Sequence, residues 1–129
     1  MTLEHFNMLA DEVADEIPQE FFRQLNGGII LQPRAKLHPA SVPESPLYIM
    51  GEYCRSYMMG RHINIYYGSM DASYGNCSDE EMKAHIRSTI FHEFRHHLES
   101  LGGSRELEKE DAVRLADYRR RYHIQDTDS

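Results

Sequence analysis

Hydrophobic residues recur every three to four positions near the start of the chain, which predicts an amphipathic helix. Thr2 can cap its N-terminus, and acidic residues separate the apolar ones. Pro18 ends this periodicity and favours a second, short helical segment that stops at Asn26-Gly27-Gly28. The inward positions of the two segments are Leu3, Phe6, Met8, Leu9, Val13, Ile17, Phe21, Phe22 and Leu25. We expect this region to be scaffold.

A longer helix is predicted over residues 79–101. Ser78 and Glu81 have the spacing of a capping box, and Gly102-Gly103 is a stop signal. Placing the residues at helical intervals puts the apolar ones on one broad arc. They are Met82, Ile86, Ile90, Phe91, Phe94, Leu98 and Leu101. We expect this arc to face the core.

Short apolar runs between the helices predict strands at residues 29–31, 47–53 and 62–67. In the last of these, Ile63 and Ile65 alternate with polar or aromatic residues, at His62, Asn64 and Tyr66. Successive side chains of a strand point to opposite faces. The alternation therefore predicts one buried face and one face open to solvent or a ligand.

The connecting segments are interpreted from their turn residues. Four prolines between positions 33 and 46 exclude a regular helix and indicate an extended surface loop beside the cleft. Residues 55–60 are expected to form a loose hairpin connection, and residues 68–77 a polar loop.

A last helix is predicted after Gly103, capped by Ser104. Its apolar stripe consists of Leu107, Leu115, Tyr118 and Tyr122. Asp111 falls within that stripe, where an acid is out of place. One interpretation is a carboxylate at the edge of the stripe that reaches water. The other is functional: two antiparallel helices joined at Gly102-Gly103 would bring Asp111 opposite His96.

Composition limits the classes of partner. A chain of 129 residues suits one domain, residues 1–129. Its net charge is −7, and its one basic cluster, Arg119–Arg121, fits the last turn of a helix, which argues against nucleic acid as a partner. No apolar run is long enough to cross a membrane. Because Cys54 and Cys77 form no C-x-x-C motif and no signal peptide is evident, we expect a cytoplasmic protein with reduced thiols.

The chemistry is concentrated at His92-Glu93-Phe94-Arg95-His96. On a helix the outer residues of H-E-x-x-H share one face, here opposite the apolar arc, so both rings can ligate one Zn²⁺ ion. Glu93 then lies beside the ion, where a carboxylate can accept a proton from a metal-bound water. The motif predicts a metallohydrolase with Glu93 as general base.

Helix geometry separates the neighbouring histidines from this pair. His97 falls within the apolar arc, which favours a structural, hydrogen-bonded role. His85 lies two turns before His92, about 10 Å along the axis, which is too far for a shared metal ion. We therefore expect His85 at the rim of the site or exposed.

The doubled histidine of H-E-x-x-H-H, preceded by Gly51-Glu52-Tyr53 and by the Ile-x-Ile-Tyr run at residues 63–66, resembles the small zincin-like metallopeptidases called minimal zincins. The resemblance covers nearly the whole chain. It implies a compact α+β domain with an N-terminal helix, a small mixed sheet of about three strands, the H-E-x-x-H helix and a C-terminal helix. It also implies a zinc-dependent peptidase.

The third metal ligand is where the sequence departs from the family pattern H-E-x-x-H-x-x-G-x-x-D. Glu99 and Gly102 occupy the glycine and aspartate positions. If the G-x-x-D part of the pattern is moved one helical turn along, Gly103 takes the glycine position and Glu106 the aspartate position. Glu106 is therefore the third ligand by resemblance. Antiparallel packing of the two helices favours Asp111 instead. Glu99, at i+3 from His96, would crowd that imidazole and is expected to support it from outside the metal's coordination shell.

Two functional hypotheses follow. The first is a zinc metallopeptidase whose peptide or unfolded-protein substrate pairs with the strand containing Ile63, Ile65 and Tyr66, provided that strand is a sheet edge. The alternative is a catalytically silent metal-binding module that recognises peptides or proteins, which the disrupted ligand spacing favours.

Overall fold

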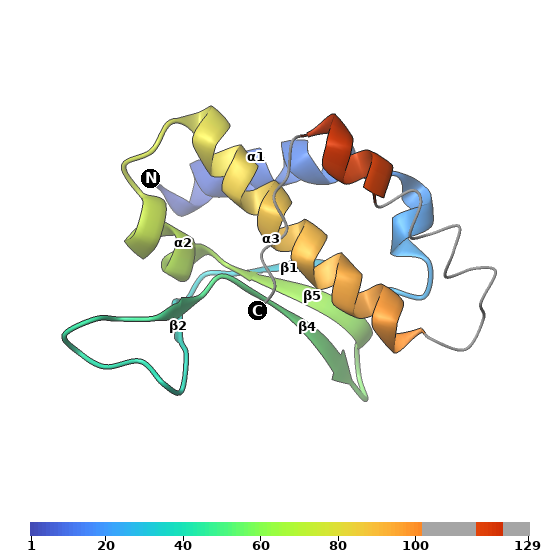
Figure 1. Ribbon diagram of the computed structural model, residues 1–129, viewed down its shortest axis with the longest axis horizontal. Coiled ribbons are helices and arrows are strands. Elements are labelled where there is room, and N and C mark those ends of the chain that lie inside the picture. The colour runs from blue at the N-terminus through green and yellow to red at the C-terminus, as the bar shows by residue number, and fades with distance from the viewer. Residues whose placement is uncertain (102–115, 123–129) are drawn as a thin grey trace.

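The computed structural model describes residues 1–101 and 116–122, and Figure 1 shows the arrangement. The elements are α1 (Leu3–Asp15), a 3₁₀ turn η1 (Gln19–Phe22), β1 (Gly28–Gln32), β2 (Lys36–Leu37), β3 (Tyr48–Ile49), β4 (Gly51–Ser56), β5 (Gly60–Tyr66), α2 (Tyr67–Tyr74) and α3 (Asp79–Ser100). Residues 116–121 are also helical. The fold is α+β, as predicted.

The main sheet has the strand order β1-β5-β4 within the described residues. β1 is parallel to β5, and β4 is antiparallel to it, so the sheet is mixed as expected. β2 and β3 pair as a separate antiparallel ribbon that projects from the sheet (Figure 1). β4 is consequently an edge strand of the main sheet.

The core lies between the sheet and a helical layer made of α1 and α3 (Figure 1). The predicted arc of α3 supplies Met82, Ile86, Ile90, Phe91 and Phe94, all buried. α1 supplies Phe6, Leu9 and Val13, and the segment after it supplies Ile17, Phe21 and Leu25. Each fully buried side chain of this size contributes about 1.5–3 kcal/mol relative to an exposed one. The apolar periodicity therefore located the core.

Two of the inward positions predicted for α1 are wrong. Leu3 is 38% and Met8 47% exposed, because both lie beside the stripe that contacts α3. The start of α1 is as expected: the Thr2 side chain accepts a hydrogen bond from the backbone N–H of His5.

The prediction of an open face on residues 62–67 is also wrong. β5 is the central strand, and His62, Ile63, Asn64, Ile65 and Tyr66 are all buried. On the face that carries His62, Asn64 and Tyr66, the polar side chains contact other side chains of the protein. Asn64 meets Gln32 and Cys54, and the Tyr66 hydroxyl donates to Glu52 at 2.5 Å.

Residues predicted as a polar loop after β5 form helix α2 instead. Tyr67, Met70 and Tyr74 have helical spacing and pack against the core, and this spacing was the signal in the sequence. Gly68 obscured this helical pattern in the sequence. The structure requires glycine at this position, because a Cβ at Gly68 would collide with the backbone nitrogen of Ala35. The close approach of the two backbones therefore explains a glycine inside a helix.

The hairpin between β4 and β5 is tighter than predicted. Pairing continues to Ser56 and Gly60, which leaves residues 57–59 as the turn. The proline-containing segment is a loop, as expected, interrupted by the short pairing of β2 with β3. Tyr48 and Ile49 of β3 bring the end of this loop to the cleft described below.

Across the described part of the chain, no helix is long and apolar enough to cross a membrane. In the helical segment 116–121, Tyr118 is buried against the 3₁₀ turn, with its ring centroid 5.8 Å from that of Phe21. Tyr122 lies under Arg87, whose guanidinium carbon is 4.9 Å from the ring centroid. The predicted inward positions Tyr118 and Tyr122 are thus confirmed.

Candidate metal centre

Helix α3 carries the H-E-x-x-H motif, and its start is fixed as predicted. The Ser78 side chain accepts from the backbone N–H of Glu81, and the Glu81 carboxylate accepts from the backbone N–H of Ser78. Three acids, at positions 79–81, occupy the first turn, where they interact favourably with the helix dipole. The motif is therefore positioned by a well-capped helix that packs its apolar arc on the sheet.

His92 and His96 point toward a common position. Their Nε2 atoms are 3.2 Å apart, and their ring planes are nearly perpendicular at 87°. Both rings are half-buried, on the side of α3 away from its apolar arc. At this separation at most one of the two facing nitrogens carries a proton, so at least one presents a lone pair.

This separation fits a shared metal ion. Two imidazole nitrogens about 2.0–2.1 Å from a tetrahedral zinc ion are roughly 3.3–3.4 Å apart. The observed 3.2 Å between His92 Nε2 and His96 Nε2 is close to that value. The pair therefore supplies two nitrogen donors with the spacing that zinc requires.

Glu93 lies between the helix and the edge strand and is 7% exposed. Its carboxylate accepts a hydrogen bond from the backbone N–H of Tyr53 in β4. Burial raises the pKa of Glu93, while His92, His96 and the Tyr53 N–H act in the opposite direction. A carboxylate held in this way is oriented beside the paired histidines and has a raised proton affinity, as a general base needs.

Gly51 permits β4 to approach α3 at this point. A Cβ on Gly51 would lie 2.6 Å from Cγ2 of Thr89, and 3.7 Å from Cγ of Glu93. Any side chain at position 51 would therefore push the edge strand away from the helix. The requirement for glycine here follows from packing and not from an unusual backbone angle.

Glu99 lies where it can support His96 from outside the pair. One carboxylate oxygen is 3.4 Å from Nδ1 of His96, and the other is 3.8 Å from Nε of Arg95. A proton on His96 Nδ1 facing Glu99 leaves Nε2 as the lone-pair donor. The role of Glu99 in supporting a metal-bound His96 stays a prediction.

His97 is buried and structural, as predicted. Its Nε2 is 2.7 Å from the carbonyl oxygen of Arg23, and its Nδ1 is 2.8 Å from the hydroxyl of Tyr53. Because a carbonyl only accepts, Nε2 carries the proton. On the other side of the ring, Nδ1 and the Tyr53 hydroxyl form a hydrogen bond. His97 thus ties the end of η1 and the edge strand to α3.

His85 lies at the rim of the site, as expected. Its ring is stacked on that of Tyr74 from α2, with centroids 3.6 Å apart and planes inclined by 6°. It is one of the residues lining a hollow that leads to His92 and Glu93.

Two adjoining hollows form a cleft between α3 and β4. One, of about 440 Å³, extends from His92 and Glu93 toward His85 and Tyr74. The other, of about 650 Å³, extends from the same pair toward Glu99 and Ser100. Gly51 lines both. His92 and Glu93 line both hollows and therefore lie in the middle of the cleft, and His96 lines the second hollow.

Both candidates for the third protein ligand, Glu106 and Asp111, lie outside the described residues. Among residues 1–101 and 116–122, no group of three histidine, cysteine or acidic side chains is placed to hold a metal ion. The choice between Glu106 and Asp111 stays a prediction.

The pattern of residues in the sequence gave no physical reason to place Tyr53 and Gly51 in the site. Tyr53 contributes its backbone N–H to Glu93 and its hydroxyl to His97. The signal available was the Gly51-Glu52-Tyr53 sequence, which was recognised through the family resemblance and not from a physical argument.

The comparisons with known proteins bear on family and fold. No protein-family model and no curated protein sequence matches the chain. Among solved structures, a conserved hypothetical protein from Thermus thermophilus is 36% identical, with a TM-score of 0.65. The match covers 79% of this chain and 98% of that one.

At this identity and coverage, the chain belongs to the same family as the Thermus protein. That relative is itself described as a conserved hypothetical protein. Family membership therefore establishes the shared α+β fold, and the function has to be argued from the chemistry of the site.

Proposed function

We propose that this protein is a zinc-dependent metallopeptidase that hydrolyses peptide bonds with Glu93 as general base. The observation that carries the proposal is the convergence of His92 Nε2 and His96 Nε2, 3.2 Å apart, beside the buried carboxylate of Glu93. These three groups lie in a cleft along an edge strand. Their chemistry and placement support hydrolysis in a site that a polypeptide can enter.

The metal would be held by His92, His96 and one acid, Asp111 or Glu106. When bound, zinc lowers the pKa of a coordinated water and polarises a carbonyl oxygen. Glu93 accepts the proton of the attacking water and then donates it to the nitrogen of the leaving amine. The Tyr53 N–H keeps the carboxylate oriented during both transfers.

We assign the strand that would pair with a peptide substrate to β4, and not to β5 as predicted from the sequence. β5 has partners on both sides, so Ile63, Ile65 and Tyr66 cannot pair with a peptide. β4 is an edge, and its residues Gly51 and Tyr53 line the cleft. An extended peptide can add to such an edge through main-chain hydrogen bonds.

A reducing, cytoplasmic location is part of the proposal. Cys54 and Cys77 are both free thiols and half-buried. Secreted proteins of this size commonly pair their cysteines, whereas cytosolic ones keep them reduced. The substrate would then be an intracellular peptide or an unfolded segment of a protein.

The decisive experiment compares the wild type with Glu93→Gln after both are loaded with zinc. The amide side chain keeps the shape of the carboxylate and cannot accept the proton. We expect stoichiometric zinc in both proteins, and peptide cleavage that falls by at least about a hundredfold in the variant. Equal turnover by the two proteins would remove Glu93 as the base.

A catalytically silent module that binds zinc and recognises peptides is the second candidate. It is favoured by the ligand spacing in the sequence, where Glu99 and Gly102 occupy the glycine and aspartate positions of the family pattern. Stoichiometric zinc and peptide binding without turnover in the wild type would support this candidate over the peptidase.

A further inference from the structure

Two arms project from the main sheet on the side away from the helical layer, as Figure 1 shows. The ribbon arm, residues 36–49, includes β2 and β3, and the hairpin arm, residues 55–61, joins β4 to β5. Among the described residues, eight large hydrophobic side chains are exposed. Six of them lie on these arms: Leu37, Val42, Leu47, Tyr57, Met58 and Met59. Exposed apolar side chains are therefore concentrated on the arms.

The tip of the hairpin arm extends into solvent. Tyr57 is fully exposed, and Met58 is 89% exposed. The turn itself is closed by other groups: Ser56 pairs with Gly60, and the Ser56 hydroxyl accepts from the backbone N–H of Met59. The fold therefore does not use the two apolar side chains at the tip. Exposed apolar groups of this kind, rimmed by polar residues, are typical of a contact surface.

Charge is distributed unevenly along the chain. The sheet and both arms lie within residues 28–66, which contain four basic and two acidic residues, a net charge of +2. Because the whole chain carries −7, all other residues together carry −9. The four basic residues of this part are Arg34, Lys36, Arg55 and Arg61. The part of the chain that bears the arms is thus the part that an anionic partner would favour.

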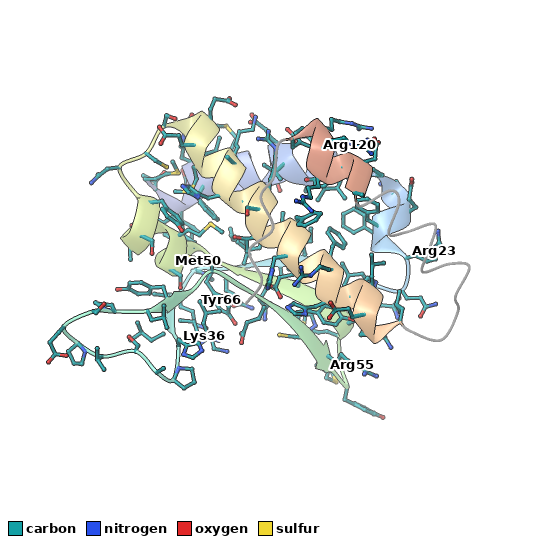
Figure 2. The ribbon with its side chains drawn as sticks, in the orientation of Figure 1. Arg23, Lys36, Met50, Arg55, Tyr66 and Arg120 are labelled. Atoms are coloured by element: carbon teal, nitrogen blue, oxygen red, sulfur yellow. The ribbon has the colours of Figure 1, made fainter. Side chains whose placement is uncertain are left out.

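The basic side chains lie close to the arms. The guanidinium carbon of Arg34 is 5.3 Å, and Nζ of Lys36 5.7 Å, from the ring centroid of Tyr66. These two residues are at the base of the ribbon arm. Arg55 is exposed on the hairpin arm, and Figure 2 shows Lys36 and Arg55 on the side of the molecule away from Arg120 and the helical layer. Each arm therefore has a cation beside its apolar residues.

Many of the acids lie on the far side of the molecule. The exposed face of α1, which is turned away from the core, carries Glu4, Asp11, Glu12 and Asp15. A helix is about 10–12 Å across, and charges in physiological salt are screened over about 8 Å. This negative face is consequently more than one screening length from the arms. A surface that touches the arms meets positive charge locally, although the protein as a whole is negative.

A planar surface fits the two arms better than a folded protein does. Between the arms lies a polar face of the sheet, on which Glu52, Cys54 and Asn64 contact other side chains of this protein. A folded partner would need two separate hollows at the right spacing. The interface of a bilayer accepts apolar tips wherever they meet it, and it does so without a membrane-spanning helix. Tyrosine suits that interface, and arginine can extend its head group to the phosphates.

We propose that the two arms form a docking surface for an anionic lipid membrane. Tyr57 and Met58 enter the head-group region, while Arg34 and Arg55 pair with lipid phosphates. The cytoplasmic leaflet is the anionic one in cells, which matches the location proposed above. The inference depends neither on zinc nor on peptide hydrolysis.

Co-sedimentation with lipid vesicles tests the proposal. One set of vesicles is pure phosphatidylcholine, and the other contains about 30% phosphatidylglycerol to supply negative charge. Each basic residue near the surface contributes about fivefold, so we expect partition at least about tenfold stronger on the anionic vesicles at low salt. Raising the salt from about 0.05 M to about 0.5 M should remove most of this difference. A wild type that does not partition onto the anionic vesicles would overturn the proposal.

The apolar contribution is tested with the double variant Tyr57→Ser/Met58→Ser. We expect its partition onto anionic vesicles to be weaker by at least about tenfold. The matched control is Leu3→Ser/Met8→Ser, which removes two exposed apolar side chains from α1 and should partition like the wild type. Circular dichroism verifies that both variants are folded. Equal losses in the two variants would contradict docking through the arms.

The charge contribution is tested with Arg55→Gln. Its partition should fall about fivefold on anionic vesicles and stay unchanged on phosphatidylcholine. Arg120→Gln makes the same change at an exposed position of the helical segment 116–121, away from the arms (Figure 2), and should have no effect. An equal effect of both substitutions would mean that net charge, and not this surface, governs the binding.

Insertion is measured by fluorescence, since the chain contains no tryptophan. The single tryptophan of Met58→Trp should shift its emission to shorter wavelength when anionic vesicles are added, because it leaves water. The tryptophan of Met8→Trp, on α1, should not shift. Gel filtration covers the competing occupant. Self-association that Tyr57→Ser/Met58→Ser abolishes, in a protein that ignores the vesicles, would assign the arms to a second copy of the chain and overturn the proposal.

Discussion

The hydroxyl of Tyr53 lies 2.8 Å from Nδ1 of His97, and this contact joins the edge strand β4 to helix α3. The same hydroxyl is 2.8 Å from Oγ of Ser100, which in turn accepts from Arg61 of β5 at 2.7 Å. On the backbone side, the Tyr53 N–H donates to Glu93. One tyrosine thus connects the sheet, the structural histidine and the expected general base.

Tyr53→Phe removes this hydroxyl while keeping the ring. We expect a loss of about 1–3 kcal/mol in the free energy of unfolding, because Nδ1 of the buried His97 loses its hydrogen-bond partner. Urea denaturation followed by circular dichroism measures the loss. Tyr57→Phe is the control, because Tyr57 is fully exposed at the hairpin turn and should change the stability by less than about 0.5 kcal/mol. Equal effects of the two variants would contradict a linking role for Tyr53.

His92→Ala and His96→Ala should each abolish stoichiometric zinc binding. The reason is that each removes one of two nitrogen donors 3.2 Å apart. His38→Ala, on the exposed loop after β2, is the control and should retain zinc. Elemental analysis after dialysis gives the occupancy. Full occupancy in either motif variant would rule out the site.

The third ligand can be found by removing each candidate acid. One of the two variants Asp111→Ala and Glu106→Ala should lose zinc affinity by more than tenfold, about 1.4 kcal/mol. The other variant should bind zinc almost as tightly as the wild type. Asp111 is the slightly favoured residue, because antiparallel packing of the last helix brings it opposite His96. Competition with a chromogenic chelator measures the dissociation constants.

Glu99→Ala completes this series. Its carboxylate is 3.4 Å from Nδ1 of His96, on the far side of the ring from Nε2, so a smaller loss of affinity is expected than for the true ligand. If none of the three substitutions changes the dissociation constant by tenfold, a site with three protein ligands is wrong.

Gly51→Ala should destabilise the protein and displace β4 from Glu93. The added Cβ would lie 2.6 Å from Cγ2 of Thr89, so the Thr89 side chain or one of the two backbones has to move. We expect a loss of about 1–3 kcal/mol, as for other overpacked sites. Thr89→Ser removes that methyl group and should recover part of the loss in the double variant. Strictly additive losses, measured by urea denaturation, would show that the two positions are not in contact.

The acid stability of the protein should depend on Glu52. Burial disfavours its charged form, but hydrogen bonds from Lys36 at 2.6 Å and from Tyr66 outweigh this and lower the pKa of Glu52. Figure 2 shows Lys36 and Tyr66 close together where the β2–β3 ribbon meets the sheet. A lowered pKa in the folded state adds stability that is present above the unfolded pKa of about 4.3 and is lost as pH falls through the folded value.

Glu52→Gln removes this acid-dependent contribution. Between pH 7 and pH 3 the free energy of unfolding should therefore fall less steeply in the variant than in the wild type. Lys36→Met tests the cause, since the carboxylate then loses its main partner and the pH dependence should shrink in the same direction. Identical pH profiles for the wild type and both variants would mean that the ion pair does not stabilise the fold.

Local patterns in the sequence determined much of this protein. The apolar arc of α3, its capping box and the placement of His92 and His96 opposite that arc depend on residues within one helix. Helical periodicity fixes those relations without any distant contact. The buried, structural position of His97 followed from the same geometry, and so did the rim position of His85.

Only the tertiary structure decided which strand is an edge and what surrounds Glu93. The alternating residues of β5 are typical of a half-buried strand, yet β1 and β4 enclose it from both sides. The role of Gly51 depends on Thr89, and that of Tyr53 on Glu93 and His97, and these pairs are far apart in sequence. Strand order and close approach are set by packing between distant segments, which one strand's residue pattern does not encode.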